Sequence, residues 1–87
     1  MPRRGRIELM QEILKDALKE TPKTRLMYMN NLSFTCCNYY IKYLLDKELI
    51  AEISTPEGRT LYKTTKRGQE FLEVVGKLKE FVDFVGF

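Results

Sequence analysis

The sequence contains no histidine, and its only two cysteines, Cys36 and Cys37, are adjacent. Because zinc sites are assembled from several cysteine and histidine ligands, we expect no zinc site within one chain. Adjacent cysteines rarely bridge each other, since their disulfide would close a distorted ring. We expect Cys37 to pack in the core as a small hydrophobic residue and Cys36 to be incidental. The alternative is a redox switch, in which oxidation of an exposed thiol changes binding.

The chain also lacks the sequence features of most enzymes and membrane proteins. No glycine-rich phosphate loop and no serine–base pair is evident, so we expect no catalysis, cofactor, metal ion or small-molecule ligand. No apolar run approaches the ~18 residues that span a bilayer. The basic residues 1–6 are not followed by the apolar segment of a signal peptide, because Glu8 and Glu12 interrupt it. These absences predict a cytoplasmic protein without a membrane partner.

What the sequence does contain is typical of one small globular domain. It has 87 residues, of which 44% are hydrophobic and 31% are charged. The net charge of +3 is unevenly distributed, because residues 1–67 carry +5 and residues 68–87 carry −2. This asymmetry predicts a part that binds a polyanion, followed by an acidic and apolar part that self-associates.

Hydrophobic periodicity predicts three helices in the first half of the chain. Apolar residues recur with helical spacing over residues 7–18. A shorter helix is expected over residues 24–29, before a turn at residues 30–31. A third helix is expected over residues 34–47, and Ser33 can cap it by accepting a backbone N–H group.

A hairpin and a last helix follow. Residues 49–53 and 60–64 have the composition and alternation of two strands, and the connection between them contains a proline and a glycine that suit a tight turn. Thr65 can cap a final helix over residues 66–85.

This order of elements predicts a winged helix-turn-helix. The fold class is α+β and mainly α, with three helices, a two- to three-stranded wing and a C-terminal dimerisation helix. We expect residues 1–65 to form the winged-helix part and residues 66–87 the dimerisation helix of the same single domain.

The third predicted helix carries side chains that suit DNA recognition. In the major groove, asparagine can pair with adenine, threonine can contact a thymine methyl group, and lysine or tyrosine can reach guanine or phosphate. The candidates on the outward face are Thr35, Asn38, Tyr39, Lys42 and Tyr43. The alternative is an ordinary solvated face, which two outward tyrosines disfavour.

Cations in the predicted wing and at the N-terminus are further candidates for DNA contact. Arg59 lies at the wing tip and Lys63 lies on the returning strand, in a stretch that contains no acidic residue as far as Arg67. A basic arm at the N-terminus carries Arg3 and Arg4. Such cations bind phosphates or enter a minor groove. The alternative is that they are solvated charges.

Apolar residues of the last helix repeat at spacings of four and three, as in a heptad seam about two heptads long. The expected dimer contacts are Phe71, Val75, Leu78, Phe81, Val82 and Val85. One small domain can hardly cover so many apolar side chains, so we expect a homodimer held by a coiled coil. The alternative is a helix folded back on its own domain.

A resemblance to a known family is carried by three segments, Asn31–Phe34, Leu49–Ile50 and, above all, Tyr62–Gly68. They resemble the small archaeal winged-helix proteins that are regarded as predicted transcriptional regulators. The resemblance implies DNA binding and dimerisation through an antiparallel coiled coil of C-terminal helices. The chain departs from the family pattern at Glu48, where members usually have glycine. A glutamate there must adopt a left-handed conformation or end the helix differently.

Together, these features predict a nucleoid-associated homodimer that binds double-stranded DNA in a sequence-specific manner and regulates transcription. The third helix would enter the major groove, and the wing would contact the flanking backbone or minor groove. Two alternatives remain open, because fold alone does not determine function. One is an architectural protein that coats DNA without reading its sequence. The other is a winged-helix module that binds another protein.

Overall fold

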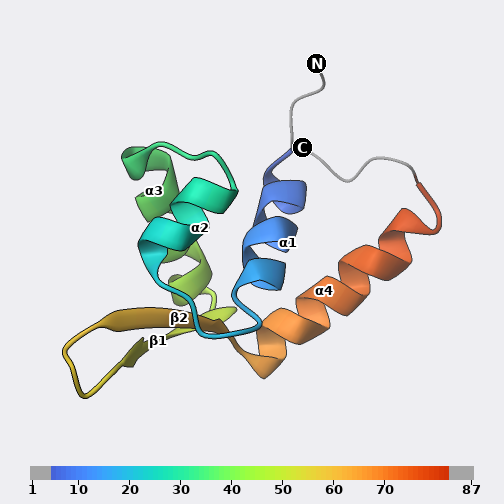
Figure 1. Cartoon of the computed structure of the whole chain (residues 1–87). Coiled ribbons are helices and arrows are strands. Elements are labelled where there is room, and N and C mark those ends of the chain that lie inside the picture. Colours follow the sequence, from blue (N-terminus) through green and yellow to red (C-terminus); the bar gives the residue numbers. More distant parts are fainter. Residues whose placement is uncertain (1–4, 83–87) are drawn as a thin grey trace.

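The computed structural model describes residues 5–82, in which a group of three helices carries a projecting hairpin and a fourth helix (Figure 1). The elements are α1 (Arg6–Asp16), α2 (Lys23–Met29), α3 (Phe34–Asp46), β1 (Ile50–Ser54), β2 (Thr60–Thr64) and α4 (Lys66–Lys79). This confirms the predicted order and the mainly helical α+β class. No helix within residues 5–82 is both long and apolar enough to cross a membrane.

Local hydrogen bonds define both ends of α3. At its start, the hydroxyl of Ser33 accepts the backbone N–H of Cys36 at 3.1 Å, as predicted. At its end, Glu48 has a φ of 61°, and the N–H of Leu49 donates to the carbonyl of Leu44 at 2.9 Å. This is a Schellman motif with glutamate at the position that glycine usually occupies. Of the two outcomes expected for Glu48, the chain therefore adopts the left-handed one.

The wing consists of two antiparallel strands and one residue from a distant segment. β1 and β2 pair in register, with Ile50 opposite Thr64 at the base of the wing. The turn requires Gly58, whose φ of 87° is rarely adopted by residues with a side chain. Thr21, between α1 and α2, exchanges two backbone hydrogen bonds with Tyr62, at 3.0 and 2.7 Å. The wing therefore has two strands, the lower number of the two- to three-stranded wing that the sequence predicts, with a one-residue bridge at its side.

The core lies between α1, α2, α3 and the base of the wing. The largest fully buried side chains are Ile13, Leu14, Leu26, Leu44 and Cys37. They come from three helices, and each helix turns its apolar face toward the others. The predicted core position of Cys37 is confirmed. α4 lies on the other side of α1 from α2 (Figure 1), where Phe71 and Leu72 pack against the core.

The segment that joins β2 to α4 is bonded to two other parts of the chain. The Thr64 hydroxyl donates to the carbonyl of Leu14 in α1 at 2.6 Å, and the Thr64 N–H donates to the carbonyl of Ala17 at 2.8 Å. The Thr65 hydroxyl donates to the carbonyl of Glu48 at 2.7 Å. These bonds fix the base of the wing against the end of α1 and against the corner between α3 and β1.

Two helices end earlier than predicted. α1 ends two residues earlier, at Asp16, and α4 ends at Lys79 instead of near Val85, which lies outside the described residues. α4 packs against α1 in its first half and then diverges from it (Figure 1), and its last residue, Lys79, still reaches α1 by donating from its ammonium to Oε1 of Gln11 at 2.8 Å. Beyond this contact the described residues are exposed, and Phe81 has 83% of its surface accessible. Helical turns that lack tertiary packing have little stability of their own, so α4 ends where its support ends.

Gly68 is required where α4 leaves the wing. A Cβ atom at this position would collide with the carbonyl oxygen of Leu49 and with the Thr64 side chain, whereas a Cβ atom at Gly76 would meet no atom within 4 Å. We expect Gly68→Ala to lower the free energy of unfolding by about 1–3 kcal/mol, because backbone must move to admit the methyl group.

The matched control is Gly76→Ala on the same helix, which should raise the free energy of unfolding by up to about 1 kcal/mol through helix propensity. Urea unfolding at one fixed protein concentration measures both changes. Equal effects of the two substitutions would mean that the Gly68 contact does not constrain the fold.

Candidate nucleic-acid interface

Four of the five candidate residues of α3 form one exposed surface. Lys42 and Tyr43 follow Tyr39 by three and four residues, and Tyr39 follows Thr35 by four, so the four residues share one side of the helix. All four are exposed. Tyr39 is 55% exposed and Tyr43 is 40% exposed. Asp46 adds one acidic group to the same side. The surface therefore offers an ammonium group and three hydroxyl groups that can donate to bases or phosphates.

The fifth candidate, Asn38, lies at the edge of this surface and is half-buried. Its Oδ1 atom accepts a hydrogen bond from the ammonium of Lys23, the first residue of α2, at 2.7 Å. The same ammonium lies 5.5 Å from the centre of the Phe34 ring, in a cation–π contact. Sequence reasoning missed Lys23, because it lies 15 residues from Asn38 and no local pattern connects them.

A small hollow of about 270 Å³ lies between α3 and the start of α1. Its lining residues are Arg6, Ile7, Met10, Tyr39, Tyr40 and Tyr43. The rings of Tyr39 and Tyr40 meet edge to face with their centres 5.3 Å apart. The outward tyrosines are thus only partly solvated, and Arg6 places a cation beside them. The predicted arm residues Arg3 and Arg4 lie outside the described residues.

The wing separates the cations that are close together in the sequence. Arg59 lies in the turn at the tip, and Lys63 is exposed on β2. Lys66 and Arg67 begin α4 at the opposite end of β2, about 20 Å from the tip at the usual rise of a strand. The wing (Figure 1) therefore presents Arg59 apart from the main body of the protein, and these cations do not form one patch.

The predicted dimer residues of α4 divide into two groups. Val75 is only 3% exposed and Phe71 is half-buried, so both pack within their own chain. This part of the helix therefore folds back on its own domain, as the alternative interpretation of the sequence expected. The apolar residues that remain exposed are Val74, Leu78, Phe81 and Val82.

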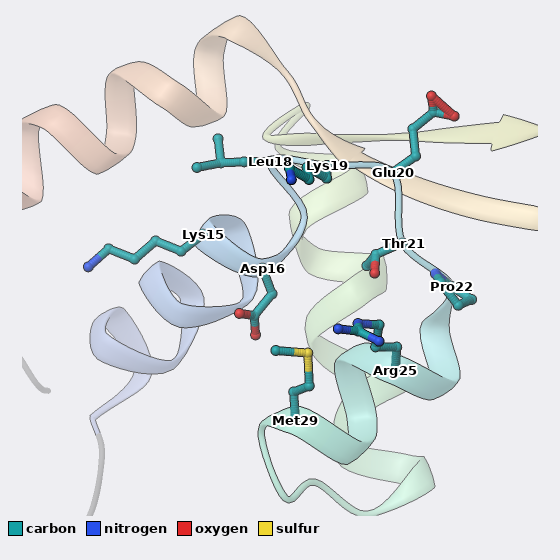
Figure 2. Close-up of a pocket in the computed structure, with 9 residues that line it drawn as sticks. All are labelled: Lys15, Asp16, Leu18, Lys19, Glu20, Thr21, Pro22, Arg25 and Met29. Atoms are coloured by element: carbon teal, nitrogen blue, oxygen red, sulfur yellow. The ribbon is translucent and has the colours of Figure 1, made fainter.

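A larger hollow of about 610 Å³ lies between the end of α1 and α2 (Figure 2). Its lining residues are Lys15, Asp16, Leu18, Lys19, Glu20, Thr21, Pro22, Arg25 and Met29. Arg25 and Met29 extend from α2 toward Asp16, whereas Glu20 points away (Figure 2). Charges of both signs line this hollow, and none of its residues belongs to α3 or to the strands. It therefore adds no residue to the candidate DNA surface.

The adjacent cysteines lie in different environments. Cys37 is buried and Cys36 is partly exposed. Burial raises the pKa of the Cys37 thiol, although the nearby Lys23 charge lowers it by a smaller amount. A buried thiol with a raised pKa is unreactive, because the thiolate is the nucleophile. Within residues 5–82, histidine, cysteine, aspartate and glutamate form no group of three or more that could hold a metal ion.

Comparison with known proteins identifies the family. The sequence profile described as winged helix-turn-helix matches residues 3–83, and the chain belongs to this family. It is 38% identical over 74 residues to an uncharacterised protein of Methanocaldococcus jannaschii, MJ0290. The match covers 84% of this chain but only 33% of that relative, so the chain spans about a third of the relative's length. The predicted resemblance to archaeal winged-helix proteins is confirmed.

Solved structures confirm the fold. Sso10a-2, a DNA-binding protein from Sulfolobus solfataricus, has a TM-score of 0.80 and 19% identity, covering 92% of this chain and 83% of its own. The reduced form of the transcriptional regulator YodB from B. subtilis has a TM-score of 0.76 and 16% identity, covering 90% and 78%. A mutant of MepR from S. aureus, bound to an oligodeoxyribonucleotide, has a TM-score of 0.74 and 10% identity, covering 88% and 57%. These similarities show a common winged-helix fold.

The environments of the cysteines predict their reactivity. In the folded protein near pH 8, Ellman's reagent should modify Cys36 rapidly and Cys37 only after unfolding, because the raised pKa and burial of Cys37 leave little accessible thiolate. Cys36→Ser should abolish the rapid phase, and Cys37→Ser should retain it. Rapid modification of both thiols in the native protein would contradict the buried position of Cys37.

Proposed function

We propose that this protein is a homodimeric, sequence-specific DNA-binding regulator of transcription that acts in the nucleoid. The observation that carries the proposal is the exposed side of α3, where Thr35, Tyr39, Lys42 and Tyr43 project from a helix flanked by a wing. A helix with protruding donors fits the major groove, and a hairpin beside it can reach the flanking backbone. Membership of the winged helix-turn-helix family supports this arrangement.

In the proposed complex, α3 lies in the major groove with its exposed side toward the base edges. Arg59, at the tip of the wing, contacts flanking phosphates or a minor groove, and Lys63 supports it from β2. Arg6, at the start of α1, continues the cationic surface beside the tyrosines of α3. The arm residues Arg3 and Arg4 would extend this contact along the DNA backbone.

The composition of the α3 surface favours base reading over nonspecific coating. Proteins that coat DNA depend on many phosphate contacts, which require many cations. Among the described residues, the exposed side of α3 itself carries one cation, Lys42, next to three hydroxyl groups. Lys47, just past the helix, and Arg6, at the start of α1, lie beside the tyrosines, and the whole chain has a net charge of only +3. We therefore place the architectural role and the protein-binding role second, as outcomes that the DNA-binding experiment distinguishes.

The proposed dimer forms through α4, with residues 66–87 as the dimerisation helix and residues 1–65 as the reading part of the same domain. Support comes from the exposed apolar side chains Val74, Leu78, Phe81 and Val82, which face away from the core. Apolar side chains gathered in this way usually mark an interface. A two-fold dimer would present two copies of α3 to two related half-sites.

DNA binding is tested by fluorescence anisotropy on random and genomic duplexes over a range of salt concentrations. Wild-type protein should bind with an affinity that falls steeply with salt, and it should prefer some genomic fragments. Lys42→Ala and Arg59→Ala should each weaken binding and reduce the salt slope by about one unit, because each loses a phosphate contact.

The control for these variants is Lys77→Ala, which removes an exposed cation from α4, away from α3 and the wing. It should leave the salt slope unchanged. Binding without preference among fragments would favour an architectural protein. Absence of binding even at low salt would reject the proposal and favour a protein partner for the same surface.

The dimer is tested by sedimentation equilibrium. Leu78→Glu and Phe81→Glu should each shift the protein from dimer to monomer, because a charge placed in an apolar interface is costly to bury. Tyr28→Glu is the control, since Tyr28 is 86% exposed on α2 and its loss should leave the oligomeric state unchanged. A wild-type protein that is monomeric at high concentration would contradict the proposed dimer.

A further inference from the structure

The contact between Lys23 and Asn38 joins the start of α2 to the middle of α3. The Lys23 ammonium is fixed by two neighbours, the Oδ1 atom of Asn38 at 2.7 Å and the Phe34 ring at 5.5 Å. The carbonyl of Lys23 also lies 4.0 Å from the Sγ atom of Cys37, within the weak hydrogen bonds that sulfur makes. Lys23 is half-buried by these contacts. These contacts hold the Lys23 side chain against α3.

This contact determines which end of the Asn38 side chain faces outward. An ammonium group has three hydrogen-bond donors and no acceptor, so only the oxygen of the Asn38 amide can face it. The amide nitrogen must then point away from Lys23. An asparagine without such a neighbour could turn its amide by half a rotation and present either end to a ligand.

We propose that Lys23 is a positioning residue that makes Asn38 a hydrogen-bond donor to DNA and thereby sets base preference at one position of the half-site. This inference rests on the proposed function. Guanine presents two acceptors in the major groove, N7 and O6, and the donated amide hydrogens of Asn38 match them. Adenine presents an acceptor and a donor, and its bidentate pairing with asparagine needs the amide oxygen as well.

The sequence alone suggested that Asn38 pairs with adenine. The contact with Lys23 leads to a different expectation. The amide oxygen has two lone pairs, and the Lys23 ammonium occupies one of them. To pair with adenine in two hydrogen bonds, the same oxygen would also have to accept from the adenine amino group, next to a cation that already holds it in a strong, charge-assisted bond. Guanine presents only acceptors at this edge, so it places no second donor on that oxygen. The geometry of the contact therefore favours guanine.

The experiment compares the affinities of the full chain for duplexes that differ only at single positions of its selected site. Lys23→Met removes the ammonium and retains the unbranched side chain over the Phe34 ring. At one position, wild-type protein should prefer guanine to adenine, and Lys23→Met should lower this ratio of affinities by roughly tenfold, within the range that one bidentate pair supplies.

Lys19→Met is the matched control, because it removes the same charge from the neighbouring connection between α1 and α2. It should leave the ratio unchanged. In an Asn38→Ala background, Lys23→Met should likewise leave the ratio unchanged, since the amide that it orients is gone. If Lys23 only contacted a phosphate, Lys23→Met would weaken binding to every duplex equally and would leave the guanine-to-adenine ratio unchanged.

The outcomes separate this inference from the proposed function. Specific binding by wild-type protein with a guanine-to-adenine ratio that Lys23→Met does not change would overturn the inference and leave the regulator intact. A wild-type preference for adenine at the position that Asn38→Ala affects would overturn it as well. Failure of wild-type protein to bind any duplex at low salt would reject both.

Discussion

The relative positions of the helices and the wing depend on the hydrogen bonds at the junction between β2 and α4. There, the Thr64 hydroxyl donates to Leu14 in α1 and the Thr64 N–H donates to Ala17, just past the end of α1. The Thr65 hydroxyl donates to the carbonyl of Glu48 and also accepts the N–H of Gly68, which caps α4. Gly68 allows the backbone of α4 to approach that of Leu49 closely. Because one short segment bonds to α1, to the end of α3 and to α4, the relative positions of these elements are set together. The wing has no independent core, so its direction also follows from this segment.

The same junction explains why the most specific segment of the family resemblance, residues 62–68, contributes little to the candidate surface itself. Tyr62 is buried, its hydroxyl lies 3.4 Å from Glu52, and burial followed by the Glu52 charge raises the Tyr62 pKa. Thr64 is buried as well. These residue types are needed for packing and hydrogen bonding. Of this segment, Lys63 is proposed to contact DNA, and the other proposed groups lie on α3, at the wing tip and at the start of α1.

The two proposed roles of α4 follow from which of its apolar side chains are covered by the same chain. α4 covers α1 with Phe71, Leu72 and Val75, and this contact completes the core of one chain. Farther along, Leu78, Phe81 and Val82 are exposed, although Lys79 still bonds to Gln11 of α1. One helix therefore stabilises the domain at its beginning and is proposed to bind a second copy at its end. In such a dimer, the spacing between the two reading helices would depend on the direction of α4, which the junction fixes.

The sequence by itself determined the order and type of the elements, both predicted caps, the glycine turn of the wing and the core position of Cys37, because these depend on periodicity and on neighbours within four residues. Tertiary structure decided what depends on distant partners. It bonded Thr21 to Tyr62, buried Val75, ended α4 at Lys79, and separated Arg59 from the cations at the base of the wing. It also turned the Asn38 amide toward Lys23. No local pattern encodes that contact, because residues far apart in the chain meet only after the helices have packed.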